Sequence, residues 1–163
     1  AKTAIEALGL HWSVSYARAG IVACTGSVGC KFAASDTKQH AALLADHLDD
    51  QLQLDQPLNI HLTGCPNSCA QHTIADIGLL GTSVEADDEE MVEGYDVFLG
   101  GGFGEHQALG QKIFAKVQAP QLPPLIAHVL RAYQANRENP QESFQAFINR
   151  HGLEAIKSLV ETA

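Results

Sequence analysis

The sequence predicts an α+β fold, in which a mixed sheet with flanking helices is followed by a helical C-terminal tail. Short apolar or alternating segments typical of strands recur through the first two thirds of the chain, and one helical segment interrupts them. The last third has the pattern and the proline punctuation of helices. This order of strand, helix, several strands and then helices is typical of an α+β domain.

The first strand is predicted in the apolar run at residues 21–24. A helix is expected to begin near Asp36, because Asp36 and Gln39 have the spacing of a capping box. Three leucines recur at every fourth residue and would share one face of this helix: Leu44, Leu48 and Leu52.

Three more strands are predicted in the middle of the chain. Residues 58–63 alternate apolar and polar side chains, and residues 74–80 and 95–99 are apolar segments with glycines beside or within them. The acidic cluster at residues 87–90 lies between the last two segments, so we expect it to be the solvated tip of a hairpin.

The rest of the chain is expected to be helical, in segments at residues 108–117, 122–135 and 141–161. We divide the chain into an α+β domain, residues 1–117, and a helical C-terminal extension packed on it, residues 118–163.

The charge balance excludes some partners. The chain has 10 Lys and Arg against 19 Asp and Glu, a net charge of −9, which repels phosphate backbones and anionic lipid. No run approaches the roughly 18 apolar residues of a membrane helix, and the N-terminus lacks the pattern of a signal peptide. We therefore expect a cytoplasmic protein that binds neither nucleic acid nor membrane.

The four cysteines fall in two pairs. Cys24 and Cys30 form C-x5-C, and Cys65 and Cys69 form C-x3-C, each in a loop that follows an apolar strand. If the two strands are neighbours, both loops leave the same edge of the sheet. Four thiolates could then converge on one point.

The spacing leaves three kinds of site open. Structural zinc usually takes cysteines two to four residues apart, and C-x5-C is wider than that. A [4Fe–4S] cube is larger, and each iron takes its own thiolate, so wide and uneven spacing suits it. The pattern favours a cluster, but a non-catalytic four-cysteine zinc module and buried or disulfide-bonded cysteines remain alternatives.

Three segments resemble the sirohaem-dependent nitrite and sulfite reductase family: ACTGSVGC at residues 23–30, HLTGCPNSCAQHTIADIGLLG at residues 61–81, and EGYDVFLGGGFG at residues 93–104. The resemblance runs from about residue 20 to residue 117, and the helical tail resembles bacterial members more loosely. It implies the α+β fold of a nitrite/sulfite reductase 4Fe-4S domain.

The resemblance also implies roles for particular residues. The four cysteines would ligate a [4Fe–4S] cluster, and Cys69 would also supply the axial sulfur to the iron of sirohaem, which makes it the catalytic residue. We expect cofactor contacts at Asn67, Thr25 and Lys31. A turn role for Asn67 and a solvated Lys31 are the alternatives, and His72 is expected to be a packed or surface histidine rather than a proton relay.

As for activity, the resemblance implies the six-electron reduction of nitrite to ammonia by an assimilatory nitrite reductase. Reduction of sulfite to sulfide is the alternative, and Ser68 favours nitrite because sulfite reductases often have glycine in its place. A related cobalamin-pathway monooxygenase is a third possibility.

The family's enzymes are longer, and Arg and Lys residues that precede the cysteines hold their substrate anion. Here only 23 residues precede Cys24, and the basic residues near the cysteine loops in sequence are Arg18, Lys31 and Lys38. We therefore expect this chain alone to be an incomplete, inactive part that needs the remainder of the reductase. Its electron donor would be a ferredoxin or a flavin module linked to NAD(P)H.

Overall fold

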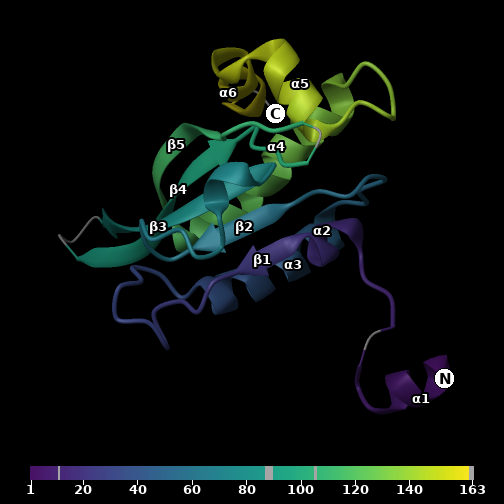
Figure 1. Cartoon of the computed structure of the whole chain (residues 1–163), viewed down its shortest axis with the longest axis vertical. Helices are drawn as coiled ribbons and strands as arrows, with labels where there is room; N and C mark the ends of the chain where they lie inside the picture. Colours follow the sequence, from purple (N-terminus) through teal and green to yellow (C-terminus); the bar gives the residue numbers. More distant parts are fainter. Residues whose placement is uncertain (11, 87–89, 105, 162–163) are drawn as a thin grey trace.

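A five-stranded mixed sheet organises the chain (Figure 1). The computed structural model describes residues 1–10, 12–86, 90–104 and 106–161. Its elements are, in chain order, α1 (Lys2–Ala7), α2 (Tyr16–Ala19), β1 (Ile21–Ala23), α3 (Thr37–Gln51), β2 (Ile60–Thr63), the 3-10 turn η1 (His72–Ile74), β3 (Ile77–Glu85), β4 (Met91–Leu99), β5 (Gln111–Gln118), the 3-10 turn η2 (Ala119–Gln121), α4 (Leu122–Asn136), α5 (Phe144–His151) and α6 (Leu153–Glu161).

The strands lie side by side in the order β1-β2-β3-β4-β5. β1, β2 and β3 are parallel, with Ala23 opposite Leu62, whereas β4 runs antiparallel to both β3 and β5. The predicted mixed sheet is therefore confirmed. The predicted cap is confirmed too, because the Asp36 carboxylate accepts a hydrogen bond from the backbone N–H of Gln39 at 3.2 Å.

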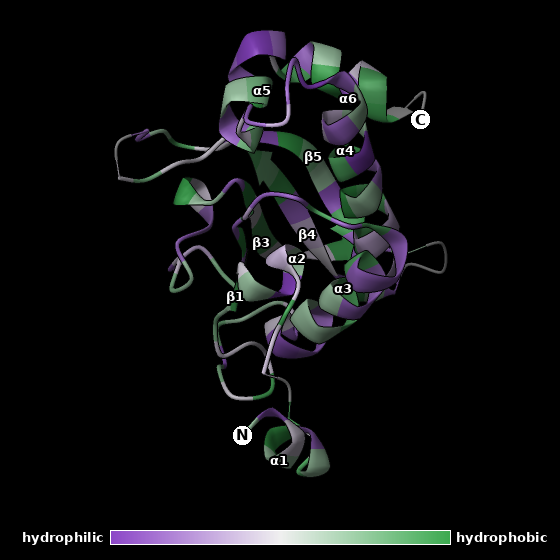
Figure 2. Cartoon of the chain, turned by 90° about the vertical axis from the view of Figure 1, so that its right-hand side faces the viewer, coloured by the Kyte–Doolittle hydropathy of each residue, from purple (hydrophilic) through white to green (hydrophobic). Residues whose placement is uncertain are grey.

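Helices α3 and α4 lie on one face of the sheet (Figure 2). α5 and α6 lie together at one end of the molecule, and α1 stands apart from its body with no buried residue (Figures 1 and 2). One continuous hydrophobic core joins the sheet to the helices, and its fully buried members include Leu44, Leu48, Ile77, Leu79, Ile126, Leu130 and Phe147. The division of the chain after residue 117 stays a prediction.

The prediction of a helix at residues 108–117 is wrong, because residues 111–118 form the strand β5. This strand pairs with β4, with Phe114 opposite Val97 and Val117 opposite Tyr95. Gln, Lys and Ala favour helices, but pairing along the free edge of β4 satisfies the backbone groups of both strands and buries part of Phe114 and Val117. Tertiary pairing therefore overrides the local propensity.

Two other expectations differ from the structure in detail. The helix expected at residues 141–161 is two helices, α5 and α6, because Gly152 breaks it with φ +76°. The strand expected at residues 74–80 begins at Ile77, since η1 occupies residues 72–74. The expected acidic hairpin tip at residues 87–90 lies mostly outside the described residues. No helix of the described chain is long and apolar enough to cross a membrane.

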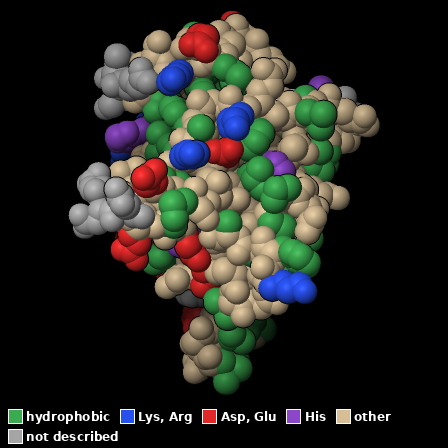
Figure 3. All heavy atoms as spheres, turned by 90° about the vertical axis from the view of Figure 1, so that its left-hand side faces the viewer, with side chains coloured by type: hydrophobic (Ala, Val, Ile, Leu, Met, Phe, Trp, Pro, Cys, Tyr) green, Lys and Arg blue, Asp and Glu red, His purple; other side chains and the backbone are tan. Residues whose placement is uncertain are grey.

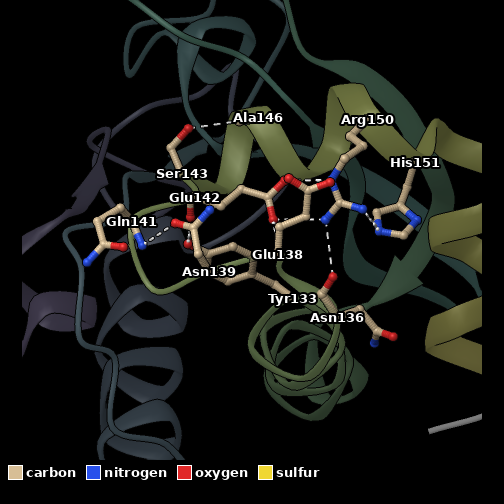
Figure 4. Close-up of polar contacts among 10 residues, drawn as sticks. All are labelled: Tyr133, Asn136, Glu138, Asn139, Gln141, Glu142, Ser143, Ala146, Arg150 and His151. Carbon is tan, nitrogen blue, oxygen red and sulfur yellow. Dashed lines mark hydrogen bonds and ion pairs between the residues drawn. The ribbon is translucent and has the colours of Figure 1, made fainter.

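A polar cluster ties the start of α5 to the end of α4 (Figure 4). Arg150 donates to both carboxylate oxygens of Glu142, at 2.7 and 2.8 Å, and to the backbone oxygen of Asn136 at 3.1 Å. The hydroxyl of Ser143 caps α5 by accepting from the N–H of Ala146 at 3.2 Å. The C-terminal helices are thus held to one another by charge as well as by packing.

Candidate functional site

The two cysteine loops leave the sheet at the same edge. β1 and β2 are parallel neighbours, so the segments that follow them emerge together. Cys24 comes directly after β1, and its N–H donates to the oxygen of Leu62 on β2 at 3.0 Å. Cys65 comes two residues after the end of β2. The condition for both loops to leave the same edge, that the two strands are neighbours, is therefore met.

The loops also contact each other directly. The backbone N–H of Gly64 donates to the sulfur of Cys24 at 3.2 Å, and the N–H of Ala34 donates to the oxygen of Gly64 at 2.7 Å. A Cβ placed on Gly64 would lie 2.7 Å from the Cβ of Ala33. Only glycine allows this approach without displacement of the neighbouring loop.

Several groups around Cys24 favour its thiolate. Burial raises the pKa of this thiol, but hydrogen bonds from Thr37 and from the backbone N–H groups of Gly64 and Gly26, together with the charge of Lys38, outweigh it and hold the pKa below the ordinary value. The thiolate is the form that binds metal. The sulfur chemistry at this position therefore fits a soft metal or an iron–sulfur cluster.

The four cysteines differ in exposure, and all are free. Cys65 is buried, Cys24 and Cys30 are half-buried, and Cys69 is exposed. Among the described residues, no group of three or more His, Cys, Asp or Glu side chains is arranged to hold a metal ion. The assignment of the four cysteines as ligands therefore stays a prediction.

The loop that carries Cys69 has an unusual backbone. Ser68 and Gln71, on either side of Cys69, have φ angles of +55° and +54°. The hydroxyl of Ser68 lies 2.9 Å from Nδ1 of His72, which is only 6% exposed and packs edge-on against Phe98. Burial lowers the pKa of His72, so the neutral ring is favoured. His72 is thus a packed histidine, as expected.

The other predicted cofactor contacts lie on exposed positions of the loops. Thr25, Lys31 and Asn67 are all exposed, and Nζ of Lys31 lies 5.1 Å from the ring centroid of Phe32. Their contacts with a cofactor stay predictions. Arg18 is engaged elsewhere, because its guanidinium lies 2.6 Å from the carboxylate of Asp46 and 2.8 Å from that of Asp49, both on α3.

Sequence reasoning missed a carboxylate that supports the first cysteine loop. Glu93 on β4 accepts from the hydroxyl of Ser27, inside the C-x5-C loop, at 3.1 Å, and from the N–H of Asp36 at 2.9 Å. Nε2 of His40 lies 3.6 Å from the same carboxylate. These partners are far from Glu93 in sequence, and no local pattern marks them.

The surface at this side combines apolar and acidic side chains. Figure 3 shows the face seen from the left of Figure 1, where acidic side chains lie mainly toward one margin, and hydrophobic side chains and several Lys or Arg side chains are scattered over the rest. Val28 and Phe32, in and beside the C-x5-C loop, are 84% and 64% exposed. Phe103 and Leu109 line a separate pocket of about 370 Å³ that also contacts Ile74.

Residues 17–163 match the family described as the nitrite and sulphite reductase 4Fe-4S domain. The chain belongs to this family. The match includes both cysteine loops and the C-terminal helices, so it extends beyond the segments that carried the resemblance. The expected family and α+β fold are therefore confirmed.

Individual relatives agree with this membership. The ferredoxin–nitrite reductase of Synechococcus elongatus is 48% identical over 111 residues, which are 68% of this chain and 22% of that protein. Sulfite reductase [ferredoxin] 1 of Mycolicibacterium paratuberculosis is 38% identical over 161 residues, 95% of this chain and 29% of that protein. The structure of Mycobacterium tuberculosis NirA superposes with a TM-score of 0.86 at 33% identity, covering 95% of this chain and 29% of that one. The chain thus spans less than a third of the length of these relatives.

Proposed function

We propose that this chain is the [4Fe–4S]- and sirohaem-binding portion of an assimilatory nitrite reductase, which reduces nitrite to ammonia with six electrons. The observation that carries the proposal is the meeting of the two cysteine loops at one sheet edge, with the N–H of Gly64 on the sulfur of Cys24. In a member of a 4Fe-4S domain family, this meeting of the loops supports one shared cluster site for the two cysteine pairs.

Each part of the loops has a role in this proposal. The thiolates of Cys24, Cys30, Cys65 and Cys69 would hold the cluster, and the exposed Cys69 would also be the ligand of sirohaem iron. When bound, the two groups would supply the electron transfer that the reduction requires. Gly64 donates to the sulfur of Cys24, Glu93 supports the loop that carries Cys24 and Cys30, and the surroundings of Cys24 favour its ionised sulfur.

Sulfite is the second candidate substrate, and the extent of the matches keeps it open. The Synechococcus ferredoxin–nitrite reductase is more identical to this chain but matches 68% of it, whereas the Mycolicibacterium sulfite reductase matches 95%, including the C-terminal helices. Ser68, in the PNSC segment, supports nitrite. The comparison of kcat/KM for the two anions in the intact enzyme would decide between them.

The proposed partners follow from the relatives and from the charge. The Synechococcus and Mycolicibacterium relatives are ferredoxin-dependent by name, so we take a ferredoxin as the donor, with a flavin module linked to NAD(P)H as the alternative. The net charge of −9 makes this chain a poor docking surface for an acidic donor or an anion. The remainder of the reductase would supply the basic residues for both, and we place the enzyme in the cytoplasm, where thiols stay reduced.

The test is the metal content of the intact reductase and of this chain, both purified without oxygen. We expect about four iron and four acid-labile sulfide per chain, with broad absorption near 400 nm. Replacement of each cysteine by serine should lower both counts, whereas Ala155→Ser, on the exposed surface of α6, should leave them unchanged. A colourless intact enzyme with about one zinc per chain would refute the redox proposal in favour of a structural site.

A further inference from the structure

We infer that Ser68 and His72 form a positioning pair that fixes the backbone of the loop carrying Cys69. The proposed function enters only in what Cys69 would bind, since the pair itself is a feature of the described chain. The pair consists of a loop hydroxyl and a buried ring whose Nδ1 lies 2.9 Å from it.

The backbone around Cys69 needs such support. Residues that carry a Cβ rarely adopt a positive φ, because the Cβ then crowds the backbone. Three non-glycine residues in the described part of the chain do so, and two of them, Ser68 and Gln71, flank Cys69. Strained backbone of this kind persists only where surrounding contacts impose it.

The contacts that impose it converge on His72. Its ring is buried and packs against Phe98 on β4, with the ring centroids 5.0 Å apart. Its backbone packs closely against β3, because a Cβ added to Gly78 would lie 1.9 Å from the backbone oxygen of His72. His72 is therefore fixed to the sheet, and its hydrogen bond transfers that fixed position to Ser68 in the loop.

Because Cys69 is exposed, the conformation of the loop backbone determines the direction of its thiol. Cys65 is held by its own burial, but Cys69 is exposed and has little packing of its own. One neighbouring bond lies within the loop, because the N–H of Gln71 donates to the oxygen of Ser68 at 2.8 Å, and another reaches the sheet, because the N–H of Ala70 donates to the hydroxyl of Thr63 on β2 at 3.2 Å. The direction of the Cys69 thiol thus follows from the conformation of Ser68.

The first test is amide hydrogen exchange in this chain without cofactors, measured by NMR at Ala70 and Gln71. Ser68→Ala removes the hydroxyl but keeps the Cβ, and His72→Phe keeps an aromatic ring for Phe98 to pack against. Each should speed exchange at the two amides by about three- to tenfold, the loss that one hydrogen bond predicts. The N–H of Cys30, which donates to the oxygen of Gly26 in the other loop, should exchange at an unchanged rate.

Three further variants sharpen this test. His72→Asn puts an amide near the position of Nδ1 and should bring exchange back toward the wild-type rate. The double variant Ser68→Ala/His72→Phe should exchange no faster than either single variant, because both remove the same bond. His47→Phe, on α3, is the matched histidine control. Exchange that stays unchanged in both single variants, or effects that multiply in the double variant, would overturn the pair.

The second test is the midpoint potential of the cluster in the intact enzyme, which a purely structural role would leave unchanged. Ser68→Ala and His72→Phe should both shift the midpoint potential in the same direction. His72→Asn should have a midpoint potential close to that of the wild type. Faster exchange with an unchanged potential would overturn a role in positioning Cys69. An intact enzyme that binds no cluster would refute the proposed function, while the exchange rates would still decide whether the pair exists.

Discussion

The carboxylate of Glu93 accepts a hydrogen bond from the backbone N–H of Asp36 at 2.9 Å, across 57 residues of sequence. Asp36 is the residue that caps α3, and Ser27, the second partner of Glu93, lies within the C-x5-C loop. One side chain of β4 therefore joins the loop of Cys24 and Cys30, the start of α3 and the sheet.

Replacement of Glu93 by Ala should loosen this junction. Glu93 is 40% exposed, so solvent screens its hydrogen bonds, and we expect a loss of about 1 kcal/mol in the free energy of unfolding. Urea unfolding of this chain measures it, with Glu85→Ala at the exposed end of β3 as the control. Equal stability of the Glu93 and Glu85 variants would show that the junction contributes nothing.

Gly64→Ala should separate the two cysteine loops. The added methyl group would meet the Cβ of Ala33 at 2.7 Å, and overpacking of this kind destabilises by about 1–3 kcal/mol. Thermal unfolding measures the loss. Ala33→Gly, added to the Gly64→Ala variant, removes the opposing methyl group and should recover much of the lost stability. If the double variant is no more stable than Gly64→Ala, the contact with Ala33 is not the cause of the loss.

The pair of Arg150 and Glu142, at the centre of Figure 4, should make α5 sensitive to acid. The hydrogen bonds from Arg150 lower the pKa of Glu142 below its ordinary 4.5, so the folded state favours the carboxylate. This stability is present above pH 4.5 and is lost as the pH falls through the lowered pKa. Unfolding at several pH values should show Glu142→Gln less stable than the wild type at pH 7, with the gap closing in acid. A gap independent of pH would contradict the assignment.

Asp76 should have the opposite pH dependence. Burial raises its pKa above the ordinary 3.8, and the hydrogen bonds from Asn59 only partly offset this. The folded state therefore binds the proton more tightly, so Asp76 contributes stability below pH 3.8 that is lost as the pH rises through the raised pKa. Asp76→Asn keeps an oxygen for the Asn59 N–H and should remove this part of the pH profile. A profile identical to the wild type would show that Asp76 titrates normally.

The features predicted from sequence are those with a local signal. Apolar runs and alternation predict β1, β2 and β4, and the capping residues predict the start of α3. The position of each cysteine pair after an apolar strand predicts that the two loops leave one edge if those strands are neighbours, and they are. β5 was missed because its local composition favours a helix and only its pairing with β4 makes it a strand. The supports of the two cysteine loops were missed for a similar reason.

Those supports depend on geometry that sequence spacing does not carry. Glu93 reaches Ser27 across 66 residues, through the fold of the sheet. The bond between Ser68 and His72 spans only four residues, but it depends on the positive φ of Ser68, which serine does not predict. In the sequence, Ser68 favours nitrite over sulfite as the substrate. Its contact with His72 adds the conformational role that we infer.

The hydrophobic core that spans the sheet and α4 has a consequence for biosynthesis. Ile126 and Leu130 of α4 are fully buried in the same core as Ile77 and Leu79 of β3, so the helix face of the sheet stays partly open until α4 has left the ribosome. Cys24 emerges about a hundred residues earlier, by the order of synthesis. The cysteines therefore leave the ribosome before the packed body that fixes their loops is complete.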